Sequence, residues 1–136
     1  MLSMNAPAER RILVVDDDVP ILEAISDLLR SEGYVVREEP ESQRAVESAR
    51  EFQPDLVLLD LMMPTLDGVA VAHGLRNEPQ TSEVPVVLMT ASPDAKRVAT
   101  QMDATSFLCK PFTAQALLNA VRGDPSPERA NPEIAV

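Results

Sequence analysis

A chain of 136 residues is long enough for one domain with a hydrophobic core, and an aromatic content of 3% requires that aliphatic side chains build that core. The formal net charge of -10 at pH 7 argues against direct binding of DNA or RNA, because such binding depends on clustered lysine and arginine side chains. With one cysteine, no signal-peptide pattern and no apolar run near the roughly 20 residues that span a bilayer, the chain is expected to be soluble, cytoplasmic and without an internal disulfide.

The first apolar run, residues 12–15, is rich in β-branched side chains and suits a strand that is buried on both faces. The run stops at three consecutive aspartates, of which Asp18 is expected to cap the following helix. That helix begins near Pro20, because proline tolerates the first turn, and ends before Gly33. A strand and a helix therefore open the predicted domain.

The same pattern recurs along the rest of the chain. The further predicted strands are residues 34–36, 56–59, 84–89 and 107–109. The further predicted helices are residues 42–52, 69–77, 94–102 and 114–121. This alternation predicts an α/β domain over residues 11–122, with a parallel sheet, right-handed crossovers and helices on both faces. Residues 1–10 are expected to form a flexible lead-in, and residues 123–136, which contain several prolines, a disordered tail.

Reactive polar groups follow most of the predicted strands. They are Asp16, Asp17, Asp60, Thr90 and Lys110. In an open parallel sheet, ligands bind outside the carboxyl ends of the strands, so these side chains are expected to converge. Carboxylates bind hard divalent cations, a carboxylate can attack phosphorus, and an ammonium group offsets charge on phosphoryl oxygens. One aspartate or threonine alone would be explained as a turn or strand residue, but the complete set predicts a phosphoryl site.

Four segments at these strand ends resemble the receiver domains of two-component response regulators, including the single-domain chemotaxis regulator. The segments are residues 12–18, residues 58–64 with Asp67 and Gly68, residues 87–91, and residues 107–112. They occur in the family's order and at similar spacing over about residues 11–122. The resemblance implies a flavodoxin-like, doubly wound (βα)5 fold, with a five-stranded parallel sheet of strand order 2-1-3-4-5.

The resemblance also implies roles for the acidic residues. Asp60 is expected to be the phosphorylation site, in a reaction that depends on Mg²⁺ or Mn²⁺. Asp17 is expected to bind the metal ion directly and Asp16 to bind it through a water molecule. Asp60 and the backbone carbonyl of Met62 complete the expected ligand set.

Residues of the later strands have expected roles in sensing the phosphoryl group. Thr90 and Lys110 are expected to contact it, and Phe107 to turn inward when Thr90 moves. The peptide bond between Lys110 and Pro111 is expected to be cis, as is typical of the family. The fourth helix, fifth strand and fifth helix are expected to form the face that a downstream protein contacts.

The implied function is that of a stand-alone response regulator. A sensor histidine kinase or phosphotransfer protein would donate the phosphoryl group, and the chain would be a phosphoacceptor and not a turnover enzyme. No direct contact with nucleic acid or membrane is expected. Two alternatives remain: a receiver-like interaction module that is not phosphorylated, and a phosphatase with an aspartate nucleophile. The second is disfavoured because Pro20 interrupts the pattern that those enzymes show after the first strand.

The sequence departs from the family pattern in two places. Asp103 stands before Ala104 where the family has glycine, and the interval from Thr90 to Lys110 is slightly short, which predicts a trimmed fourth loop or helix. Met62 and Ser92 occupy positions that influence hydrolysis of the phosphoryl group in the family. Because an apolar Met62 would not orient a water molecule, slow self-dephosphorylation is expected.

Two further residues have unremarkable interpretations. His73, the one histidine, is expected to lie on the surface of a helix, away from the strand ends. Cys109 lies within a predicted strand and is expected to pack in the core.

Overall fold

The computed structural model describes residues 10–62, 68–91, 93–102 and 104–123. Most of the expected lead-in and tail, as well as Ser92 and Asp103, lie outside the described residues. The strands are β1 (Arg11–Val15), β2 (Val35–Glu39), β3 (Leu56–Asp60), β4 (Val86–Thr90) and β5 (Ser106–Cys109). The helices are α1 (Val19–Ser31), α2 (Ala45–Phe52) after the 3₁₀ turn η2 (Ser42–Arg44), α3 (Gly68–Asn77), α4 (Ala95–Gln101) and α5 (Ala114–Arg122).

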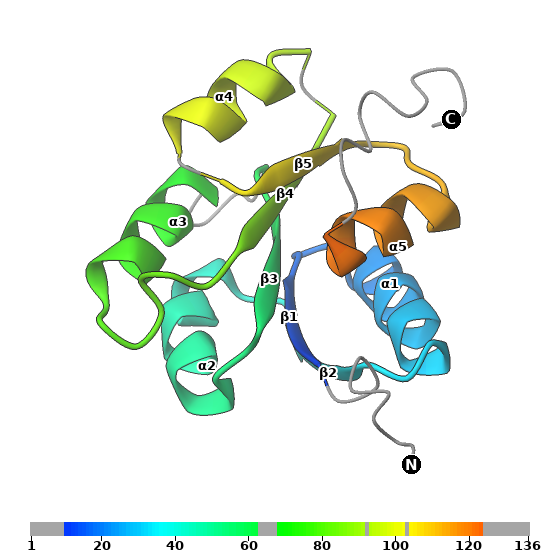
Figure 1. Ribbon diagram of the computed structural model, residues 1–136, viewed down its shortest axis with the longest axis horizontal. Coiled ribbons are helices and arrows are strands. Elements are labelled where there is room, and N and C mark those ends of the chain that lie inside the picture. The colour runs from blue at the N-terminus through cyan, green and yellow to red at the C-terminus, as the bar shows by residue number, and fades with distance from the viewer. Residues whose placement is uncertain (1–9, 63–67, 92, 103, 124–136) are drawn as a thin grey trace.

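The strands form one parallel sheet of order β2-β1-β3-β4-β5, which confirms the expected fold class and strand order. Helices α1 and α5 lie on one face of the sheet, and α2, α3 and α4 lie on the other (Figure 1). Strand order reverses between β1 and β3, since β1 pairs with β2 on one side and β3 on the other. The carboxyl ends of β1 and β3 are therefore neighbours, which is where such sheets bind ligands.

Each face of the sheet packs into its own hydrophobic cluster. Successive strand residues point to opposite faces, so Ile12 and Val14 join the cluster under α1 and α5, while Leu13 and Val15 join the other. The two clusters explain why β1, β3 and β4 are continuous apolar runs, because both faces of a central strand are covered.

Helix α1 begins as the sequence predicts. The Asp18 carboxylate accepts a hydrogen bond from the N–H of Ile21 at 3.3 Å, and a proline occupies the first turn. After the helix, Gly33 has a φ of 97°, a left-handed conformation that favours glycine. Local signals therefore set both ends of α1.

The two edge strands differ from expectation. Strand β2 extends to Glu39, whereas the sequence predicted that it would end at residue 36. Its later residues are charged: Arg37 and Glu38 are partly exposed, as an edge strand allows, whereas Glu39 is buried. Cys109, expected in the core, is exposed as the last residue of edge strand β5, so that expectation was wrong.

Candidate functional site

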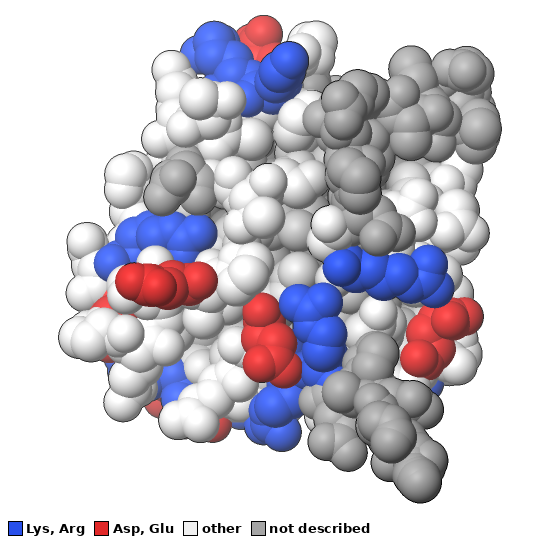
Figure 2. Space-filling model, viewed as in Figure 1, with Lys and Arg blue, Asp and Glu red and all other residues white. Residues whose placement is uncertain are grey.

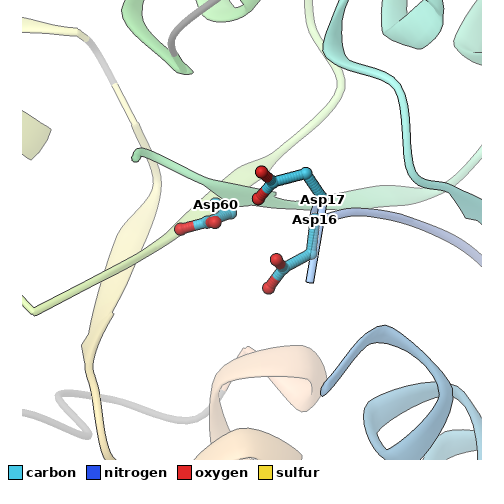
Figure 3. A group of neighbouring side chains, drawn as sticks. All are labelled: Asp16, Asp17 and Asp60. Atoms are coloured by element: carbon cyan, nitrogen blue, oxygen red, sulfur yellow. The ribbon is translucent and has the colours of Figure 1, made fainter. Parts of the chain in front are cut away.

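Three carboxylates meet at the carboxyl ends of β1 and β3. Asp60 is the last residue of β3, and Asp16 and Asp17 directly follow β1. Each of the three offers a carboxylate oxygen, and these oxygens lie within 4.8 Å of one another (Figure 3). Asp16 and Asp60 are buried, whereas Asp17 is exposed. The adjacency of two parallel strands thus brings together residues that are more than forty positions apart in the sequence.

The side chain of Lys110 reaches the same cluster from the end of β5. Its Nζ lies 3.3 Å from Oδ2 of Asp16 and 3.4 Å from Oδ1 of Asp60. The backbone N–H of Lys110 donates to the carbonyl of Thr90 at 2.8 Å, and the Lys110–Pro111 peptide bond is cis. One ammonium group therefore bridges two of the three carboxylates.

The environment of Asp60 disfavours its charge. Burial, the strongest cause, and the neighbouring charge of Asp16 raise the pKa of Asp60 from its ordinary value of 3.8 to about 6. Lys110 and the N–H of Met62, which lies 3.3 Å from Asp60 Oδ1, lower this pKa and offset part of the increase. Asp60 is still mostly ionised at neutral pH, but additional positive charge would stabilise it.

The remaining predicted residues differ in their burial. Thr90 ends β4, the strand next to Asp60, and is completely buried. Phe107, in β5, is half-buried and packs against the hydrophobic cluster beneath α2, α3 and α4. Met62 is 64% exposed and contacts Asp60 through its N–H, while the expected role of its carbonyl oxygen stays a prediction.

Residues 12–122 match the model of the response regulator receiver domain family. The chain belongs to this family. Among curated proteins it is similar to the DNA-binding response regulator MtrA of Mycolicibacterium paratuberculosis, with 39% identity over 115 residues, which are 83% of this chain and 50% of MtrA. The chain thus spans about half the length of the curated relatives it matches.

Solved receiver structures share the fold. The chemotaxis protein CheY4 of Vibrio cholerae has a TM-score of 0.78 and 28% identity, with 84% of this chain and 97% of that chain covered. The receiver domain of the sensor histidine kinase PA1611 from Pseudomonas aeruginosa has a TM-score of 0.76 and 29% identity, with 84% and 95% covered. That structure holds a magnesium ion coordinated in its active site cleft. No helix in the described parts of the present receiver domain is long and apolar enough to cross a bilayer.

The acidic cluster of this receiver domain fits a magnesium ion. Its donors are carboxylate oxygens, which Mg²⁺ prefers, and exposed Asp17 leaves the cluster open to water molecules that such an ion retains. Burial and the charge of Asp16 raise the pKa of Asp60 more than Lys110 lowers it, so additional positive charge would stabilise the ionised carboxylate. Asp16, Asp17 and Asp60 are therefore a suitable donor set for a hard divalent cation.

Gly68 lets the segment after β3 pass close to the site. A Cβ on Gly68 would lie 2.7 Å from the Cα of Leu61 and 2.8 Å from the carbonyl oxygen of Asp60. The N–H of Gly68 donates to the carbonyl of Leu61 at 3.0 Å, which joins the start of α3 to the end of β3. A side chain at position 68 would therefore clash with this backbone, which favours glycine in this chain.

Sequence analysis missed Glu39, a buried carboxylate at the carboxyl end of β2. Its backbone carbonyl accepts a hydrogen bond from the N–H of Asp16 at 3.2 Å. Because the second strand was predicted to end at residue 36, Glu39 was not recognised as a strand-end residue. A rule that requires continuous apolar runs finds central strands of a receiver domain better than edge strands.

Proposed function

We propose that this receiver domain accepts a phosphoryl group on Asp60 and signals through protein contacts that depend on phosphorylation. The observation that carries the proposal is a buried carboxylate between two further carboxylates and the ammonium group of Lys110. With Lys110 and a bound divalent cation to offset the three carboxylates, the site would suit a phosphoryl group, whose oxygens carry negative charge. The donor is a phosphohistidine of a sensor histidine kinase or phosphotransfer protein.

In the transfer step, a carboxylate oxygen of Asp60 attacks phosphorus. The new O–P bond forms as the P–N bond to the donor histidine breaks, and the electron pair of that bond leaves with the imidazole. Lys110, which lies against Asp60 before the reaction, is placed to contact a phosphoryl oxygen after it. The buried hydroxyl of Thr90 supplies a hydrogen-bond donor to the product.

Asp16, Asp17, Asp60 and the carbonyl of Met62 would hold Mg²⁺ or Mn²⁺. A bound ion would supply positive charge that compensates the carboxylates and the oxygens of the transferring group. Asp60 accepts one phosphoryl group per chain, so the domain is a phosphoacceptor and not a turnover enzyme. Histidine kinases draw their phosphoryl groups from ATP, which places the reaction in the cytoplasm.

The output is a protein contact on the face formed by α4, β5 and α5. Phosphorylation at Asp60 biases a two-state equilibrium in which Thr90 and Phe107 move together, and the partner reads this face. Direct contact with nucleic acid is not part of the proposal for residues 11–122. On the face shown in Figure 2, basic and acidic side chains of the described residues alternate and form no continuous basic surface.

Acetyl phosphate in the presence of Mg²⁺ tests the proposal, with uptake measured by intact-protein mass spectrometry. Wild type is expected to gain one phosphoryl group, and Asp60→Asn none. An unphosphorylated wild type that also fails to bind beryllofluoride would support the interaction module. Turnover of many equivalents of a phosphate ester would support the phosphatase.

A further inference from the structure

The buried carboxylate of Glu39 is held at the carboxyl end of β2 by a local hydrogen-bond network. The hydroxyl of Ser48, in α2, donates a short hydrogen bond to Oε1, and the N–H of Glu41 donates to Oε2 at 3.0 Å. Nε of Arg44 lies 3.8 Å from Oε1. Burial of a carboxylate costs free energy that these contacts offset, and an apolar side chain would fill the same position without that cost. The carboxylate at this position therefore calls for an explanation beyond packing.

The backbone of Glu39 contacts Asp16, which together with Asp17 forms the proposed metal-binding segment after β1. Asp16 donates its N–H to the carbonyl of Glu39, which continues the ladder in which Val15 pairs with Glu39. Among the strands that the structure describes, β2 lies at the edge of the sheet and pairs with β1 alone. The side chain of Glu39 binds the end of this strand to α2 and to the connection that follows it.

The metal-binding segment needs such an anchor. Lys110 offsets only part of the charge of Asp16, Asp17 and Asp60, so without a metal ion these carboxylates still repel one another, since their nearest oxygens lie within 4.8 Å. Asp17 is exposed, so the segment that follows β1 can relax outward into solvent. The hydrogen bond from Asp16 to Glu39 resists that movement only if the end of β2 is itself fixed.

We infer that Glu39 is a positioning residue for the phosphoryl site. Its side chain locks the end of β2 onto α2, and its carbonyl holds the first residue of the Asp16–Asp17 pair in place. The part of this inference that concerns magnesium rests on the proposed function. The part that concerns the position of Asp16 does not.

Amide hydrogen exchange in EDTA tests the anchor without any metal. In Glu39→Ala the Asp16 amide is expected to exchange at least tenfold faster than in wild type, because its acceptor strand end is released. The Val57 amide, which donates to Pro85 at the other end of the sheet, is expected to keep its protection. Glu38→Ala is the matched control, because it removes the same charge from the neighbouring residue, whose side chain pairs with Arg30.

Titration calorimetry with Mg²⁺ supplies the second measurement. Glu39→Ala is expected to bind Mg²⁺ about tenfold more weakly, at the lower end of the loss that follows when groups supporting a metal ligand are removed. Glu39→Gln, which keeps an acceptor for Ser48, is expected to recover part of this loss. Ser48→Ala is expected to show a smaller loss, and Glu38→Ala none.

The outcomes separate this inference from the proposed function. If wild type binds Mg²⁺ and Glu39→Ala matches it in both affinity and Asp16 exchange, the inference is wrong while the proposed function stands. An equal loss in Glu38→Ala would also overturn it, since overall charge would then be the cause. If wild type binds no Mg²⁺, the proposed function fails, and exchange at Asp16 still decides whether Glu39 is the anchor. Should Glu39→Ala not fold, Ser48→Ala gives the decision by the same two measurements.

Discussion

Asp60 shows how position changes the chemistry of a single residue. A carboxylate in water needs no partner, but Asp60 is 4% exposed and lies beside Asp16, so its charge is destabilised. The same destabilisation favours the binding of a cation at this carboxylate. The ammonium group of Lys110 lowers the pKa of Asp60, and a pKa of about 6 leaves the residue mostly ionised at neutral pH.

Replacement of Asp60 by asparagine is expected to stabilise the metal-free protein at pH 7. The folded protein holds the Asp60 proton more tightly than the unfolded chain, with a pKa of about 6 against 3.8, so its stability falls as pH rises through this interval. The penalty at pH 7 is about 3 kcal/mol, from roughly two pH units at about 1.4 kcal/mol each. Urea unfolding in EDTA from pH 3.5 to 7.5 measures it. If the free energy of unfolding of Asp60→Asn exceeds that of wild type by as much below pH 4 as at pH 7, this account is contradicted.

A second prediction at this scale concerns Met62, whose exposed side chain has no group that can orient water. Met62→Asn is expected to shorten the half-life of the aspartyl phosphate roughly three- to tenfold, a small part of what positioning a reactant can supply. Loss of the phosphoryl group, followed by mass spectrometry, measures the half-life. Met62→Leu is the control and is expected to leave it unchanged. Equal half-lives in wild type and Met62→Asn would refute the role of this position.

Individual elements matter at this site chiefly through their ends. Strands β1 and β3 deliver carboxylates because they stop at the same edge of the sheet, and α3 begins at Gly68 against the backbone of β3. Helix α4 spans Ala95–Gln101, while the expected shortening of the fourth loop or helix stays a prediction. The geometry of the site thus depends on where elements start and stop more than on their interiors.

Gly68→Ala is expected to impair phosphorylation more than folding. The added Cβ would lie 2.7 Å from the Cα of Leu61, so the backbone beside Asp60 must shift, at a cost of about 1–3 kcal/mol. Gly74→Ala is the matched control in the same helix, since its Cβ would meet only the side-chain Cγ2 of Val46 at 2.8 Å. Initial rates of labelling by acetyl phosphate and urea unfolding would be compared. Equal labelling rates in the two variants would show that the close contact of Gly68 with the backbone of Asp60 and Leu61 is not important for the reaction.

Metal binding at this site would be coupled to the stability of the whole molecule. Two hydrophobic clusters on opposite faces fix the sheet, and the sheet holds three carboxylates together at one edge against their mutual repulsion. The unfolded chain has no such cluster, so an ion that binds the site must stabilise the folded state.

Magnesium is therefore expected to raise the melting temperature. At ten times its dissociation constant, Mg²⁺ adds about 1.4 kcal/mol of stability, and each kcal/mol shifts the melting temperature of a domain of this size by roughly 3–6 °C. Asp17→Asn is the best variant for comparison, because Asp17 is exposed and its replacement disturbs no buried contact. Differential scanning calorimetry with Mg²⁺ and with EDTA measures the shift. A shift of equal size in Asp17→Asn would place magnesium elsewhere.

The sequence alone determined the central part of this protein. Strands β1, β3 and β4 are buried on both faces, so their apolar runs are visible without a structure, and polar residues mark where they stop. Asp18 and Gly33 delimit α1 through local hydrogen bonding and local backbone preference. These features depend on neighbours in the sequence.

Tertiary structure alone decided the rest. Edge strand β2 reaches Glu39, and Cys109 is exposed, because burial at a sheet edge depends on which other elements cover it. The pKa of Asp60 depends on Asp16 and Lys110, which approach it only after the strands are ordered in the sheet. The bond between Asp16 and Glu39 joins two strand ends. The pattern of apolar residues in the sequence reflects how each strand or helix is buried. The charge interactions and hydrogen bonds of the site depend instead on distances between different elements.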